Sequence, residues 1–143
     1  MKKLLSSVEA FLDCPDLGRL LLRLTIGGLL FLHGWHKVTG GTDWIQGMLA
    51  AHGLPAFIAY GVYAGEVIAP ILLILGILTR LSALTIAGNM IVAWLLVDMP
   101  KTFTIDQVGA WGLETLAFFF FGALTIAFLG AGRFSVAGNS VWR

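Results

Sequence analysis

Four long apolar segments constrain the fold of this chain more than any other feature. They cover about residues 17–36, 55–78, 81–97 and 110–129. Each is long enough to cross the hydrocarbon part of a bilayer as an α-helix, at about 1.5 Å per residue. Hydrophobic residues make up 58% of the 143 residues and charged residues 12%, a composition typical of membrane proteins. We therefore predict an all-α polytopic membrane protein with a single domain, an antiparallel bundle of four transmembrane helices.

The basic residues are distributed unevenly between the two sides of such a bundle. The side with both termini holds seven of them, and the other side holds only Lys37 and Lys101. The seven are Lys2, Lys3, Arg19, Arg23, Arg80, Arg133 and Arg143. Because cytoplasmic loops are enriched in Lys and Arg, we predict that both termini lie in the cytoplasm. Thr79 and Arg80 then mark a tight cytoplasmic turn between the second and third helices.

Charge and cysteine content argue against two classes of function. A net charge of +1 gives no basic surface for the phosphates of a nucleic acid. The single cysteine, Cys14, allows neither an internal disulfide nor a CxxC redox pair. The partner that the composition predicts is the lipid bilayer. Homo-oligomer formation is left open.

Two short amphipathic helices are predicted outside the apolar segments. Near the N-terminus, apolar residues recur at helical spacing opposite charged ones, which is typical of a helix lying on the membrane surface; the apolar residues are Leu4, Leu5, Val8, Phe11 and Leu12. In the first outer loop, Asp43 and Gln46 resemble a capping box, and Gly53 with Pro55 ends the pattern. This second helix is either a lid over the outer mouth or a Trp-anchored loop helix without a gating role.

Polar residues within the apolar segments provide the candidate site. Glu66 and Glu114 lie inside two of the segments, and a carboxylate near the middle of a membrane costs about 2.5 to 3.5 kcal/mol on insertion scales. Both carboxylates should therefore face protein or water. Counting from the helix ends places His33, Glu66 and Glu114 roughly 6 to 17 Å below the outer surface. With Lys37 and Asn89, these residues form a predicted ligand or proton site.

The second apolar segment has two features that shape the surroundings of Glu66. Pro70 lies four residues after it, and a proline inside a helix clashes with the carbonyl at i−4, so we predict a kink beside the carboxylate. Gly61, Gly65 and Ala69 form a stripe of small residues that lets a neighbouring helix approach closely.

These residue types leave three alternatives open. A carboxylate with an imidazole suits proton transfer, coupled to a quinone or to transport. The set His33, His36, Glu66 and Glu114 could instead bind a metal, although two histidines three residues apart arise often at helix ends, so a metal is less favoured. In the third alternative, Lys37 forms an ion pair with one glutamate that only fixes the register of the helices.

The polar residues and their surroundings also resemble a known family. The segments RLLLRLTIGGLLFLHGWHK and GEVIAPILLILGILTRLSAL, then Asn89 and the late GLET, are similar to the DoxX family of small four-helix bacterial membrane proteins. The resemblance covers most of residues 17–134. It implies that six residues match the recurring polar positions of the family: His33, Lys37, Glu66, Arg80, Asn89 and Glu114. The chain departs from the pattern at Ala137, where similar proteins often carry an aspartate.

The resemblance implies a location in the bacterial inner membrane and a role in quinone-linked redox chemistry. We predict a subunit of a quinone-linked redox or redox-defence system, with quinone as the expected cofactor and other redox proteins as partners. Whether the chain is itself an enzyme is left open, because it carries no redox centre of its own. Two alternatives remain: a small carrier or channel subunit that binds a cation at the same site, and a membrane scaffold that recruits soluble partners.

The charge distribution makes a direct prediction about topology. A reporter fused after Arg143 should be active only in an assay that reads the cytoplasm, and cysteines introduced at Gly41 and Thr104 should react with an impermeant thiol reagent from outside. The parent chain, which carries Cys14 alone, is the control and should stay unlabelled in intact cells. Labelling of the tail but not of the two loops would reverse the topology.

Overall fold

The computed structural model describes residue 9 and residues 12–138, and within them the fold is helical. The only β-type pairing in this part is an isolated bridge between Ile105 and Trp111. Helix α2 (Pro15–Gly40) is followed by the short helix α3 (Asp43–Ala51). A third helical stretch has four parts in series: η1 (Ala56–Tyr60), α4 (Gly61–Tyr63), η2 (Ala64–Ile68) and α5 (Ala69–Leu75). The last elements are α6 (Thr79–Ala93), η3 (Trp94–Asp98), η4 (Met99–Lys101) and α7 (Glu114–Leu129).

Three helical stretches are long and apolar enough to cross a membrane. They are Pro15–Gly40 with 26 residues, Ala56–Leu75 with 20 and Thr79–Lys101 with 23. Helix α7 is apolar but has only 16 residues, which corresponds to about 24 Å against a hydrocarbon core of about 30 Å. The predicted start of the fourth segment at residue 110 is wrong. Residues 106–113 form a turn in which Asp106 Oδ1 accepts hydrogen bonds from the N–H groups of Val108 and Ala110.

The boundary between the second and third stretches also differs from the prediction. Helix α5 ends at Leu75, because Gly76 adopts a left-handed conformation with φ 76° and ψ 28°. The N–H groups of Gly76 and Ile77 then donate to the carbonyls of Leu73 and Leu72, the pattern of a Schellman motif. The tight turn therefore comprises residues 76–78, and Arg80 lies in the first turn of α6 rather than in the turn itself.

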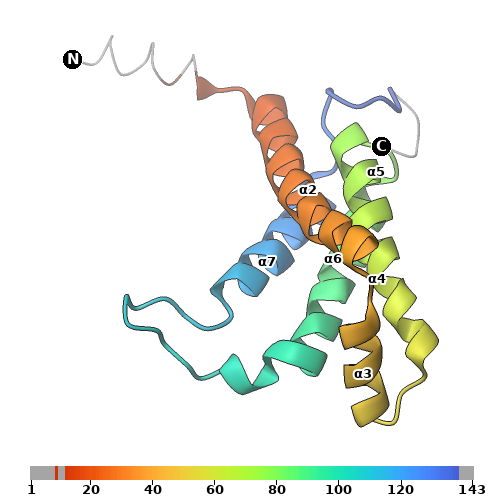
Figure 1. Ribbon diagram of the computed structural model, residues 1–143. Helices are drawn as coiled ribbons and strands as arrows, with labels where there is room; N and C mark the ends of the chain where they lie inside the picture. Colours follow the sequence, from red (N-terminus) through yellow and green to blue (C-terminus); the bar gives the residue numbers. More distant parts are fainter. Residues whose placement is uncertain (1–8, 10–11, 139–143) are drawn as a thin grey trace.

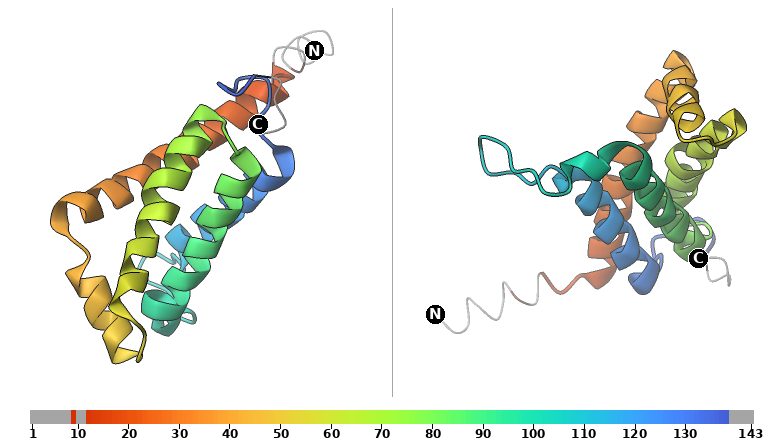
Figure 2. Two further views of the ribbon diagram at one scale, coloured as in Figure 1. Left: turned by 90° about the vertical axis from the view of Figure 1, so that its right-hand side faces the viewer. Right: turned by 90° about the horizontal axis from the view of Figure 1, so that it is seen from below.

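The four longest helical stretches pack against one another, as Figures 1 and 2 show, and enclose the larger of two apolar cores. Helix α7 lies against both α6 and α2, and the stretch that ends in α5 packs between α2 and α6. The fully buried side chains include Ile26 and Leu30 of α2, Leu73 of α5, Ile86 of α6 and Ile126 of α7.

The predicted outer-loop helix is confirmed as α3, which lies beside η1 at the far end of α2 (Figure 1). It contributes Ile45 and Leu49 to a second, smaller core with Ala59. The predicted capping box is wrong in its register, because Thr42 is the residue before the helix and its hydroxyl accepts from Gln46 Nε2 at 3.1 Å. The predicted N-terminal interfacial helix falls almost wholly on residues 1–8 and 10–11, outside the described part of the chain.

One face of α2 turns inward and carries its small residues. Arg23, Gly27, Leu30 and Gly34 are buried, whereas His33 is exposed. A methyl group at Gly27 would lie 2.8 Å from a side-chain carbon of Ile74 and 3.1 Å from the carbonyl oxygen of Pro70. A larger residue here would force the Ile74 side chain and the neighbouring backbone to shift where α2 crosses the stretch that ends in α5.

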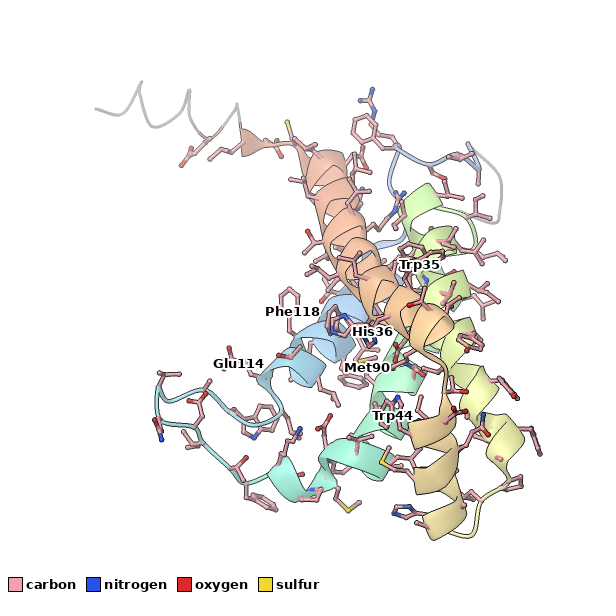
Figure 3. The ribbon with its side chains drawn as sticks, in the orientation of Figure 1. Trp35, His36, Trp44, Met90, Glu114 and Phe118 are labelled. Atoms are coloured by element: carbon pink, nitrogen blue, oxygen red, sulfur yellow. The ribbon has the colours of Figure 1, made fainter. Side chains whose placement is uncertain are left out.

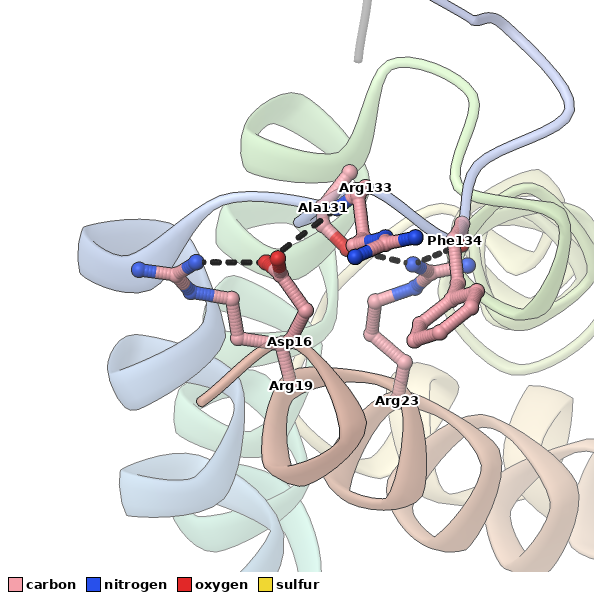
Figure 4. Close-up of polar contacts among 6 residues, drawn as sticks. All are labelled: Asp16, Arg19, Arg23, Ala131, Arg133 and Phe134. Carbon is pink, nitrogen blue, oxygen red and sulfur yellow. Dashed lines mark hydrogen bonds and ion pairs between the residues drawn. The ribbon is translucent and has the colours of Figure 1, made fainter. Parts of the chain in front are cut away.

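Arg23 connects α2 to two distant segments (Figure 4). Its side chain is 1% exposed and has no carboxylate partner among the described residues; it donates to backbone carbonyls instead. Two of these carbonyls belong to Leu73 and Ile74, at distances of 2.9 and 2.8 Å, and two to Ala131 and Phe134, at 2.6 and 2.7 Å. The first two lie at the C-terminus of α5, where carbonyls lack helical partners and a positive charge is favourable. Arg23 thus fixes the segment after α7 against the end of α5.

Candidate functional site

Lys37 and Glu66 form an ion pair between two of the long helical stretches. Lys37 Nζ lies 2.6 Å from both carboxylate oxygens of Glu66. The side chains are only 19% and 6% exposed. Asn89 of α6 completes the group, since its Nδ2 donates to Glu66 Oε1 at 3.2 Å. Three of the five predicted site residues are therefore in direct contact, one from each of the three long stretches.

The backbone around Glu66 departs from a regular α-helix. Residues Ala64–Ile68 form a π-helical turn in which the N–H of Ala69 donates to the carbonyl of Ala64. Pro70 follows and has no N–H to give to the carbonyl of Glu66, as predicted from its i+4 position. π-helical turns inside α-helices are frequently found at functional sites.

Two glycines allow the helices to approach closely enough for these contacts. A methyl group at Gly34 would overlap the backbone carbonyl of Glu66. A methyl group at Gly65 would lie 2.5 Å from the side-chain amide carbon of Asn89. The predicted small-residue stripe is thus confirmed at Gly65 and at the buried Ala69, whereas Gly61 has no atom near its missing side chain.

A cavity of about 400 Å³ opens beside the ion pair. Lys37, Glu66 and Asn89 lie at its polar wall, and α3 contributes apolar residues, among them Ile45 and Leu49. The remaining walls come mostly from apolar residues of η1, α4, α6 and η3: Ile58, Ala59, Val62, Val92, Ala93, Leu96 and Val97. Its size falls in the range typical of small-molecule sites, which are mostly apolar with a few placed polar groups.

A second π-helical turn, Trp94–Asp98, also borders this cavity. It places Asp98 in the lining, where Oδ1 accepts from Lys101 Nζ at 2.6 Å. Asp98 is not among the residues that the sequence predicted for the site. One sequence signal could have indicated it. Asp98 lies at the end of an apolar segment, one residue before Met99 and two before Pro100.

Glu114 is not part of the group around Glu66, so the predicted clustering is wrong for this residue. It is the first residue of α7 and is exposed. Figure 3 shows it on α7, well away from α3 and from Trp44, which lines the cavity. Because α7 begins at Glu114 rather than at residue 110, this carboxylate lies at the helix N-terminus, where a negative charge is favourable, instead of one turn deep.

The two histidines of the HGWHK segment are hydrogen-bonded to neither Lys37 nor Glu66. His33 is exposed, its Nδ1 lies 2.9 Å from the carbonyl oxygen of Leu29, and its ring meets Phe119 edge-on at 5.7 Å. His36 is also exposed. In residue 9 and residues 12–138, no group of three or more His, Cys, Asp or Glu side chains could hold a metal ion. The structure does not bring together the predicted metal set His33, His36, Glu66 and Glu114, because Glu66 approaches the Gly34 face of α2.

Three helical stretches long and apolar enough to cross a membrane indicate a helical membrane protein. The chain matches the DoxX family over residues 18–99, which is more than half of its length. It belongs to the DoxX family. The matched range includes all three residues of the ion-pair group.

Among curated proteins, the chain is similar to one from Bacillus subtilis (strain 168) that bears the name "Putative oxidoreductase CatD". The two are 35% identical over 88 residues, which cover 62% of this chain and 65% of the relative. The chain thus matches less than two thirds of the length of that relative. No solved structure matches the chain significantly.

The contact between Gly34 and the Glu66 backbone yields a prediction with a matched control on the same helix. Gly34→Ala should lower stability by about 1 to 3 kcal/mol, because the added methyl pushes α2 away from the Glu66 carbonyl. Gly28→Ala has open space at its methyl position and should be neutral or slightly stabilising, since alanine favours helix. Thermal unfolding in detergent, followed by circular dichroism, measures both. Equal midpoints for the two variants would contradict the close approach at Gly34.

Proposed function

We propose that this DoxX protein is an inner-membrane subunit of a quinone-linked redox or redox-defence system and that a quinone headgroup binds beside Lys37, Glu66 and Asn89. The observation that carries the proposal is the ion pair at one wall of a cavity whose other walls are mostly apolar. Membership of the family and the oxidoreductase name of the Bacillus subtilis relative agree with a redox role.

The residues at the cavity suit a quinone headgroup. Its carbonyl oxygens accept hydrogen bonds, and Lys37 has three N–H donors, of which two point at Glu66. Asn89 donates one of its two N–H groups to Glu66 and has a second to offer. Apolar walls from Ile45, Leu49 and Val92 would contact the ring.

The chain's own residues would supply binding and proton transfer. A bound quinone supplies the capacity to take up two electrons and two protons. Glu66 and Lys37 are both titratable and already share hydrogen bonds, so a proton can pass between Nζ and a carboxylate oxygen without large movement. Asn89 orients the carboxylate through Oε1. Electrons would come from another redox protein, the partner that we propose for this subunit.

The proposed arrangement in the membrane is an antiparallel bundle of four helices, with α7 as the short fourth member and both termini in the cytoplasm. The contacts of Arg23 support it, because they join the beginning of α2 to the end of α5 and to the segment after α7. These ends would then share one side of the membrane, the side rich in arginine.

Two other functions use the same structure less well. For a cation carrier, Glu66 would be the natural ligand, but Lys37 already neutralises its charge at 2.6 Å, so a cation would have to displace the lysine. For a scaffold, the recruiting surface would be the N-terminal helix and the tail, which lie largely outside the described residues. The quinone site remains the function that the geometry favours.

The ion pair provides the test. Lys37→Met alone should destabilise the protein by several kcal/mol, because it leaves the Glu66 carboxylate unpaired in low dielectric. Lys37→Met with Glu66→Gln should recover most of that stability, yet lose bound quinone and fail to complement a deletion strain under oxidative or sulfur stress. Thermal unfolding, quinone content by native mass spectrometry, and growth measure the three properties.

Glu114→Gln is the control, because it removes a membrane-segment carboxylate that lies outside the cavity. We expect this variant to keep quinone and complementation and to lose no more than about 1 kcal/mol of stability, the contribution of a negative charge at a helix N-terminus. A folded Lys37→Met, Glu66→Gln protein that retains quinone and complements fully would mean that the ion pair only fixes the register of the helices.

A further inference from the structure

We propose that the arginine-rich end of the helices, at the opposite end of α2 from Lys37, binds the headgroup of an anionic phospholipid. The site comprises Arg19, Arg80 and Arg133 around the turn that follows α7. It is independent of the proposed quinone site and shares no residue with it.

The three arginines border one turn of the chain. A methyl group at Gly130 would lie 3.5 Å from Nη2 of Arg80, and one at Gly132 would lie 3.0 Å from Cδ of Arg19. Arg133 is the next residue in this turn. Gly130 and Gly132 both adopt positive φ, 72° and 74°, which glycine tolerates and which lets the turn pass between the arginine side chains.

The turn is held in place by contacts on both sides, from Arg23 and from Asp16 (Figure 4). Arg23 Nη1 donates to the carbonyls of Ala131 and Phe134. Asp16 Oδ1 accepts from the backbone N–H of Arg133 at 3.2 Å and from Arg19 Nη1 at 2.7 Å.

The positive charge at this turn exceeds the negative charge that is paired with it. Within the described residues, Asp16 is the only acidic side chain in an ion pair with any of the three arginines. Arg19 Nε is buried and has no hydrogen-bond partner in the part of the chain that the structure describes. No described acidic side chain forms an ion pair with Arg80, and the Arg133 guanidinium lies 5.3 Å from the centre of the Phe134 ring.

Phosphate is the anion that fits these groups. Arginine presents a planar fork of donors that matches phosphate oxygens in charge and geometry. The turn lies at the ends of helices α2, α6 and α7, where an apolar helix meets the headgroup layer. Phe128 and Leu129, which immediately precede the turn, are 77% and 45% exposed and would lie along acyl chains. These apolar neighbours favour a lipid over a soluble anion.

The test uses the full chain in neutral detergent at fixed ionic strength. Adding phosphatidylglycerol should raise the thermal midpoint by about 5 °C relative to phosphatidylcholine with the same acyl chains. Arg80→Gln with Arg133→Gln should lose at least half of that rise. Lys101→Gln, which removes one positive charge at the other end of the molecule, should keep it.

Three results would overturn the proposal: the same rise with phosphatidylcholine, an unchanged rise in the arginine double variant, or the same rise with inorganic phosphate alone. A second measurement needs no variant. From an equimolar mixture of the two lipids, the wild-type chain should retain phosphatidylglycerol in clear excess in native mass spectra, and equal retention would also contradict the site.

Discussion

The structure depends most on the ion pair between Lys37 and Glu66. Two opposite charges at 2.6 Å inside a membrane protein are tolerated only because each satisfies the other and because Asn89 supplies a further hydrogen bond. The pair also constrains how closely the helices pack. Helix α2 must come so close to residues 64–68 that only glycine fits at position 34. Asn89 must come so close that only glycine fits at position 65. Charge pairing and helix packing therefore form a single constraint at this point.

The π-helical turn and Pro70 extend this constraint to function. An α-helix through residues 64–70 would space its side chains evenly, and it would still leave the Glu66 carbonyl without a partner because Pro70 has no N–H. The observed turn places Glu66 at the wall of a cavity that is otherwise lined mostly by apolar residues from α3, α6 and η3. An isolated ion pair that served register alone would need no adjoining cavity. The combination of paired charge and adjoining apolar space is what favours a small, mostly apolar ligand with hydrogen-bonding groups.

Hydrophobic length was sufficient to predict three of the long helices, and the spacing of small residues predicted the close contact at Gly65, because both are local properties. The residue paired with Lys37 was harder to choose. Glu66 and Glu114 looked alike in sequence, and the choice depends on where α7 begins, which the turn around Asp106 decides through hydrogen bonds to Val108 and Ala110. The role of Arg23 was also missed. Its four carbonyl partners come from segments about 50 and 110 residues away, and no local pattern indicates them.

The most direct test of the account is photo-crosslinking of the full chain, in lipid nanodiscs, with a quinone that carries a photoreactive group on its ring. Peptide mapping by mass spectrometry should find the label on the segments that border the cavity, residues 44–49, 58–66 and 89–98, and excess unlabelled quinone should remove it. Labelling confined to the lipid-facing part of α7, near Phe128, or labelling that unlabelled quinone does not compete away, would contradict a quinone site beside Lys37 and Glu66.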